Sequence, residues 1–263
     1  MARRFLIAGN WKMNMTAAAG AQLIKDITAQ FDCGCKCQNH AGGPEVLVCP
    51  PFTTIASVIE ATKGTVIEVG AQNVHWAEKG AFTGEISGEM LKETGVTHVI
   101  IGHSERRQYF GETDKTVNQR VLAALANGLK VVLCVGETLE QRTAGITAEV
   151  IALQVKADLA NVTAEQMANV VIAYEPVWAI GTGQVATDEQ AEEVHAGIRA
   201  LLAKTFSADV AAATRILYGG SMNAKNCGGL LAQPDIDGGL IGGAALKPAD
   251  FATIIKTAKS TAK

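Results

Sequence analysis

The chain has 263 residues, 48% of them hydrophobic, and its 23 basic and 26 acidic side chains give a formal net charge of −3. A chain of this length can bury a substantial core. The balanced charge argues against nucleic acid or an anionic membrane as the main partner, because both favour a basic face. No unbroken apolar run reaches the ~18–20 residues of a membrane span, and Phe5–Ala8 is too short for a secretion signal. We therefore expect a cytoplasmic protein.

Six cysteines are too few for a disulfide scaffold. Cys49 and Cys134 lie in apolar runs and are expected to be small buried hydrophobic residues. Cys33, Cys35 and Cys37 alternate with other residues, which differs from the C-x-x-C spacing of a zinc site, and no second cluster follows them. The sequence therefore predicts no metal site, although a redox or metal role for these three residues stays open.

Eight short apolar runs rich in β-branched residues predict strands that are buried on both faces. In chain order they are Phe5–Gly9, Val46–Cys49, Val66–Gly70, His98–Gly102, Val131–Gly136, Val170–Glu175, Arg215–Gly219 and Gly239–Gly242. Helical patterns lie between them, the clearest being Thr16–Gln30, Asp114–Asn127, Thr187–Lys204 and Pro248–Ala258. Thr187 and Gln190 form a capping-box pattern, and Pro248 suits an early helical position.

This alternation predicts an α/β chain with one (β/α)8-barrel domain over residues 1–263, in which eight parallel strands are ringed by helices. No Pro/Ser-rich linker divides the chain. An open doubly wound sheet is the alternative, but G-x-G-x-x-G is absent after the first expected strand. The active site of such a barrel lies at the carboxyl ends of its strands. Polar residues at those ends are therefore the candidates.

Glu175 ends an apolar strand, so we expect burial to raise its pKa toward the range of a general base. Pairing with a cation for stability is an equal alternative. His103 is expected to face the start of a short helix capped by Ser104, and the positive pole of that helix should keep the imidazole neutral. A neutral ring can donate a hydrogen bond to a carbonyl. The other histidines, expected to be solvated or structural, are His40, His75, His98 and His195.

Lys12 follows the first expected strand, in the run Asn10-Trp11-Lys12. Its ammonium can pair with a carboxylate, or it can stabilise negative charge that develops on a substrate oxygen. Asn10 can orient the lysine or bind substrate, and Trp11 is expected to pack while its backbone lies in the site.

Two glycine turns predict a phosphate site. Gly219-Gly220-Ser221 and Gly242-Gly243 follow the last two expected strands, where phosphate sites recur in this architecture. If Ala244–Leu246 is helical, its free N–H groups point at an anion. The segment Pro176–Ala186 is long enough to act as a closing lid, and Gly181 within it can donate an N–H to the phosphate.

Six motifs together make the chain resemble the triosephosphate isomerase family over nearly its full length. They are Gly9–Asn14, Gly70–Asn73, Gly80–Glu85, Gly102–Arg107, Ala173–Gly183 and Tyr218–Ser221. The resemblance implies interconversion of dihydroxyacetone phosphate and D-glyceraldehyde 3-phosphate without a cofactor. It implies Glu175 as the base, His103 as the neutral electrophile with Ser104 and Glu105 in support, and Lys12 with Asn10 as a substrate-binding pair. The implied phosphate cradle comprises Gly181, Ser221, Gly242 and Gly243.

The resemblance also implies a homodimer, formed through a loop at about Asn73–Glu85 that brings Thr83 near the partner's active site. Three departures from the family pattern stand out: Gln184-Val185-Ala186 at the far hinge of the lid, Ala245 in place of a usual serine, and an insertion over Cys33–Gly43. Ala245 is expected to weaken a cap or a substrate-side hydrogen bond. Two alternatives stay open, another phosphate-binding barrel enzyme such as an epimerase or lyase, and a non-catalytic descendant.

Overall fold

The computed structural model describes residues 3–31, 43–181 and 184–261. The three alternating cysteines and one histidine of the sequence predictions, namely Cys33, Cys35, Cys37 and His40, lie outside the described residues. Two residues of the expected lid, Thr182 and Gly183, also lie outside them.

Within the described ranges, eight parallel strands close into a barrel in sequence order. They are β1 (Leu6–Asn10), β2 (Glu45–Cys49), β3 (Ile67–Ala71), β4 (His98–Ile101), β5 (Lys130–Val135), β6 (Val170–Tyr174), β7 (Ile216–Tyr218) and β8 (Gly238–Ile241). Closure is seen at β1, where Leu6 pairs with Glu45 of β2 on one side and with Gly238 of β8 on the other. The predicted (β/α)8 barrel is confirmed, and the open doubly wound sheet is wrong.

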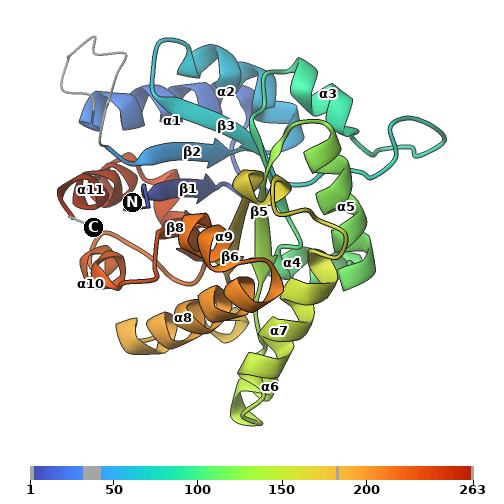
Figure 1. Cartoon of the computed structure of the whole chain (residues 1–263). Coiled ribbons are helices and arrows are strands. Elements are labelled where there is room, and N and C mark those ends of the chain that lie inside the picture. The colour runs from blue at the N-terminus through green and yellow to red at the C-terminus, as the bar shows by residue number, and fades with distance from the viewer. Residues whose placement is uncertain (1–2, 32–42, 182–183, 262–263) are drawn as a thin grey trace.

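Helices surround the strands on the outside of the barrel (Figure 1). They are α1 (Ala17–Phe31), α2 (Ile55–Thr62), α3 (Gly88–Glu93), α4 (Ser104–Phe110), α5 (Asp114–Ala126), α6 (Leu139–Thr143), α7 (Thr147–Asp158), α8 (Asp188–Thr205), α9 (Ala208–Ala213), α10 (Cys227–Ala232) and α11 (Pro248–Ser260). Short 3-10 turns between strands and helices in the described ranges are η1 (Phe52–Thr54), η2 (Gln166–Asn169), η3 (Val177–Ala179) and η4 (Gly243–Leu246). The predicted capping box of Thr187 and Gln190 starts α8, and Pro248 is the first residue of α11.

The core has two layers because successive strand side chains point to opposite faces. One layer fills the barrel interior and includes Leu47, Cys49, Val132, Cys134 and Leu240. A larger layer lies between the strands and the helices. Cys49 and Cys134 are fully buried, as predicted, and burial raises the pKa of both thiols. Since both strand faces are covered, most of the strands are largely apolar, although Glu68 interrupts β3.

The histidines outside the site that the structure describes are buried. His75 stacks on Trp76, with ring centroids 4.3 Å apart. Burial lowers the pKa of His98 to about 3 and that of His195 to about 4, so both rings stay neutral near pH 7. Their burial agrees with the expectation that these histidines have structural roles. Among the helices of the described ranges, none is long and apolar enough to cross a membrane.

Candidate active site

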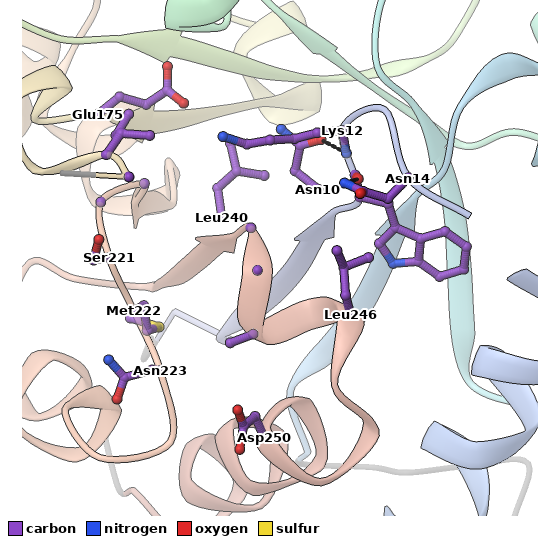
Figure 2. A pocket seen from close by; sticks show the side chains of 18 of the residues that line it. Asn10, Lys12, Asn14, Glu175, Ser221, Met222, Asn223, Leu240, Leu246 and Asp250 are labelled. Carbon is purple, nitrogen blue, oxygen red and sulfur yellow. Dashed lines mark hydrogen bonds between the residues drawn. The ribbon is translucent and has the colours of Figure 1, made fainter. Parts of the chain in front are cut away.

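A cavity of about 470 Å³ opens at the carboxyl end of the barrel. Its lining contains every residue predicted to be catalytic or substrate-binding, namely Asn10, Trp11, Lys12, His103, Glu175, Gly181, Ser221, Gly242 and Gly243. Glu175 and Ser221 lie on one side of this pocket, and Asn10 and Lys12 lie on the other (Figure 2). The lining also contains residues that the sequence analysis did not single out, among them Asn14, Ile180, Asn223, Leu240, Lys247 and Asp250.

Glu175 follows β6 directly and is only 2% exposed. Its Oε1 lies 2.9 Å from Nε2 of His103, and its Oε2 accepts the backbone N–H of Ser104 at 2.8 Å. The Glu175 N–H donates in turn to the carbonyl of Val135 at the end of β5. Both carboxylate oxygens are therefore held by groups from the end of β4, across the rim of the barrel.

His103 precedes α4 and itself caps the helix, because its Nδ1 accepts the N–H of Glu105 at 3.2 Å. The prediction of Ser104 as the cap is wrong, and the reason is that the ring folds back over the first turn. A backbone N–H only donates, so Nδ1 carries no proton in this arrangement. The neutral ring then carries its proton on Nε2, the atom that faces Glu175.

The pKa directions of the pair differ from the sequence expectation. Burial favours a higher pKa for Glu175, but the facing His103, the Ser104 N–H and the Lys12 ammonium together lower it below its usual value. Burial likewise favours a lower pKa for His103, whereas the Glu175 carboxylate raises it. The sequence expectation considered the burial of Glu175 and the helix start beside His103 separately. The structure pairs them, and each stabilises the charged form of the other.

Lys12 has a backbone φ of 51°, in the left-handed region that few residues other than glycine adopt. Its N–H donates to Oδ1 of Asn10 at 3.0 Å, and Gln72 donates its side-chain amide to the Lys12 carbonyl at 2.8 Å. The ammonium pairs with Oε1 of Glu105 at 2.5 Å. The lysine thus pairs with a carboxylate, which is one of the two predicted alternatives. It also lines the cavity, so the second alternative, stabilising charge on a substrate, stays a prediction.

Both glycine turns line the cavity, and a Cβ added at Gly242 would lie 3.6 Å from the Lys12 side chain. Gly242 precedes the 3-10 turn η4, as expected from the run Ala244–Leu246. The first N–H groups of such a turn have no partner within it and are suited to an anion. Ser221 donates its hydroxyl to the carbonyl of Ala179, at 2.7 Å, and so joins the β7 turn to the base of the expected lid.

Ala245 does not line the cavity. Its side chain is buried, and a Cβ added at Gly9 of β1 would lie only 2.9 Å from its own Cβ. The burial of position 245 beside β1 gives no support to the expected loss of a substrate-side hydrogen bond, and the expected weakening of a cap stays a prediction.

A fully buried carboxylate, Glu137, anchors the base of the lid. Its Oε1 accepts the indole N–H of Trp178 at 2.9 Å, the hydroxyl of Tyr174 at 3.0 Å and the guanidinium of Arg142 at 3.2 Å. Glu137 was not among the residues predicted from the sequence. Glu137 comes two residues after β5, so the rule of polar residues at strand ends could have found it.

The part of the chain that the structure describes holds no group of three or more His, Cys, Asp and Glu side chains arranged to bind a metal ion. The titratable groups that line the cavity are instead the ammonium groups of Lys12 and Lys247, the imidazole of His103 and the carboxylates of Glu175 and Asp250.

A closed parallel barrel with its polar residues gathered at the carboxyl rim is the architecture of the (β/α)8 enzymes. Within that class, a sequence profile of triosephosphate isomerase matches residues 5–258, and the chain belongs to this family.

Relatives at high coverage carry the same name. The triosephosphate isomerase of Acetivibrio thermocellus is 54% identical over 259 residues, which cover 97% of this chain and 99% of that protein. That of Rhodopirellula baltica is 53% identical over 260 residues, covering 99% and 100% of the two chains. That of Clostridium novyi is 51% identical over 254 residues, covering 96% and 98%.

Proposed function

We propose that Glu175, His103 and Lys12 carry out the reaction of this family, the interconversion of dihydroxyacetone phosphate and D-glyceraldehyde 3-phosphate, in one catalytic domain spanning residues 1–263. The observation that carries the proposal is the meeting of a buried carboxylate, an imidazole 2.9 Å away and an ammonium in one cavity. These are the groups that a proton transfer next to a carbonyl requires.

The ionised Glu175 takes a proton from the hydroxymethyl carbon beside the ketone. The electron pair left on that carbon forms a carbon–carbon double bond, and the carbonyl oxygen gains negative charge as an enediolate. The N–H on Nε2 of His103 donates to that oxygen, and Lys12 stabilises the same charge. Glu175 then returns the proton to the neighbouring carbon while protons move between the two oxygens, which yields the aldehyde. These steps use only side chains of this chain.

The phosphate is proposed to bind the backbone N–H groups of Gly181, Gly242 and Gly243 and the turn at Ser221. Asn10 and the backbone at Trp11 complete the pocket. Residues 176–186 act as the lid, and closing it excludes water from a reactive enediolate. The contact of the Ser221 hydroxyl with Ala179 supports this, because it links the cradle to the segment that must move.

We also propose a homodimer formed through the loop Asn73–Glu85, which projects from the barrel between β3 and α3 (Figure 1). Phe82 on this loop is 46% exposed, and Met13 beside the cavity is 94% exposed. Both are apolar side chains of a kind that a partner would cover. Light scattering should give twice the chain mass, and Thr83→Arg should shift the protein toward the monomer. A parent protein that is monomeric at micromolar concentration would contradict the dimer.

Because the reaction is a step of glycolysis, we propose a cytoplasmic location.

The activity itself is tested by following each triose phosphate in deuterated water by NMR. Isomerisation with deuterium appearing on the carbon next to the carbonyl is expected. A protein that leaves both compounds unchanged would exclude the function, and exchange on a different sugar phosphate alone would favour an epimerase or lyase.

A further inference from the structure

Arg107 lies at the centre of a charged cluster behind the site, and the proposed reaction gives it no role. It lies on α4, and its guanidinium bonds to Asp114 at the start of α5 and to Asp158 at the end of α7, 2.7 Å away in the second case. The side chain of Asp158 is fully buried, and that of Arg107 is 18% exposed. Asp114 and Asp158 therefore hold this guanidinium from two separate helices. These helices, α5 and α7, belong to the outer layer of the barrel (Figure 1).

The remaining donor of Arg107 reaches the end of β4. Its Nε donates to the carbonyl oxygen of Gly102 at 2.9 Å. That oxygen belongs to the peptide bond that leads into His103. Gly102 has a φ of +72°, and a Cβ at this position would lie 3.0 Å from Val117 and 3.2 Å from the guanidinium. The backbone just before His103 is therefore confined by close packing and held by one charged hydrogen bond.

A peptide unit is planar and turns as one piece. A rotation of the Gly102–His103 unit changes the backbone from which both the His103 ring and the Ser104 N–H project. These are the two groups that bond to Glu175, at 2.9 Å and 2.8 Å. The orientation of this one peptide consequently sets the position of the electrophile and of the base together.

We propose that Arg107 is a positioning residue, which fixes the His103 ring and the Ser104 N–H toward Glu175 through the Gly102 carbonyl. The inference rests on the role proposed above for His103. A misplacement of about 1 Å can cost about 10²-fold in rate. Loss of this hold should therefore lower kcat, while the phosphate cradle on β7 and β8 and the KM that depends on it stay nearly unchanged.

Arg199 on α8 offers a matched control. It bonds to Asp235 and Asp237 and donates to the carbonyls of Ala211 and Thr214. Its side chain is 14% exposed, close to the value for Arg107. These contacts lie at the amino ends of β7 and β8, away from the cavity. Arg199→Lys therefore removes a similar cluster without touching the backbone that carries His103.

The experiment measures kcat, KM and the melting temperature for Arg107→Lys and Arg199→Lys, each in the parent and in a His103→Gln background. Lysine keeps the charge but cannot reach Gly102 and both carboxylates at once. We expect Arg107→Lys to lower kcat by about 10- to 100-fold in the parent, with KM within about twofold, and by less than about threefold in the His103→Gln background. Arg199→Lys should lower the melting temperature and leave kcat unchanged in both.

An equal fold-loss of kcat in both backgrounds would overturn the inference, because the effect would not act through His103. An unchanged kcat in Arg107→Lys would overturn it as well. A His103→Gln variant with the parent kcat would instead refute the role of His103, and the inference with it. If Arg107→Lys does not fold, Asp158→Asn serves in its place, because it weakens the contact that fixes the Arg107 guanidinium on the side of α7. Its kcat is then compared in the parent and in the His103→Gln background.

Discussion

Nε2 of His103 lies 2.9 Å from Oε1 of Glu175, and both side chains are buried at the carboxyl end of the barrel. The proton of the neutral ring lies on the side that faces the base, because Nδ1 accepts the Glu105 N–H. The same Nε2–H is therefore available to a substrate oxygen that enters between the two groups. When the ring is neutral, this pairing places a carboxylate acceptor and an N–H donor a single hydrogen bond apart.

The first prediction concerns the pH dependence of kcat/KM. The pKa of Glu175 is lowered and that of His103 is raised, while the proposed reaction needs an ionised Glu175 and a neutral His103. Activity should therefore fall first as the pH drops through the raised pKa of His103. In His103→Gln this step is absent, and the remaining low-pH loss of kcat/KM, measured with circular dichroism to confirm folding, should follow Glu175 alone. A variant with the pH profile of the parent would show that protonation of the ring does not limit activity in acid.

A second prediction concerns stability in acid. Burial lowers the pKa of His195 to about 4, from an ordinary value of 6.5. Between these values the unfolded chain binds a proton that the folded chain does not. The free energy of unfolding should therefore fall as the pH drops from 6.5 toward 4, by on the order of 3 kcal/mol from this ring. Urea unfolding should show a weaker pH dependence in His195→Phe. A variant with the slope of the parent would contradict this source of acid sensitivity.

A third prediction concerns the link between the cradle and the lid. Ser221→Ala removes the hydroxyl that donates to Ala179 at 2.7 Å. Loss of one such hydrogen bond is worth about 1 kcal/mol, so KM for the triose phosphates should rise by about fivefold. Ser57→Ala is the control, because Ser57 on α2 makes the same type of bond to the carbonyl of Thr54 in η1, and neither residue lines the cavity. Equal effects of the two substitutions would show that the Ser221 contact has no special role in binding.

The barrel could be predicted from the sequence because strands covered on both faces leave largely apolar runs. The expected strand Val170–Glu175 corresponds to β6 (Val170–Tyr174), and Gly239–Gly242 corresponds to β8 (Gly238–Ile241). The expected and observed ends of these two strands differ by one residue. Because the strand ends were predicted closely, Lys12 and His103 could both be placed at the carboxyl end of the barrel.

Other features of the site depend on contacts between distant segments and could not be predicted. Arg107 is held by Asp158, which lies 51 residues away in the chain. Gln72 supports Lys12 from the end of β3, which β2 separates from β1, and no local pattern indicates that contact. The pKa direction of Glu175 was predicted wrongly for the same reason, since burial was inferred from neighbours in sequence while the partners come from β4 and β1.

The most direct test of the account is the Glu175→Gln variant, assayed in deuterated water with dihydroxyacetone phosphate. Glutamine keeps the shape of the side chain and cannot accept the proton. We predict that isomerisation and deuterium incorporation both fall by about 10²- to 10⁴-fold, while the variant keeps the parent's melting temperature within a few degrees. A Glu175→Gln variant that isomerises and exchanges at the parent rate would contradict the assignment of Glu175 as the base.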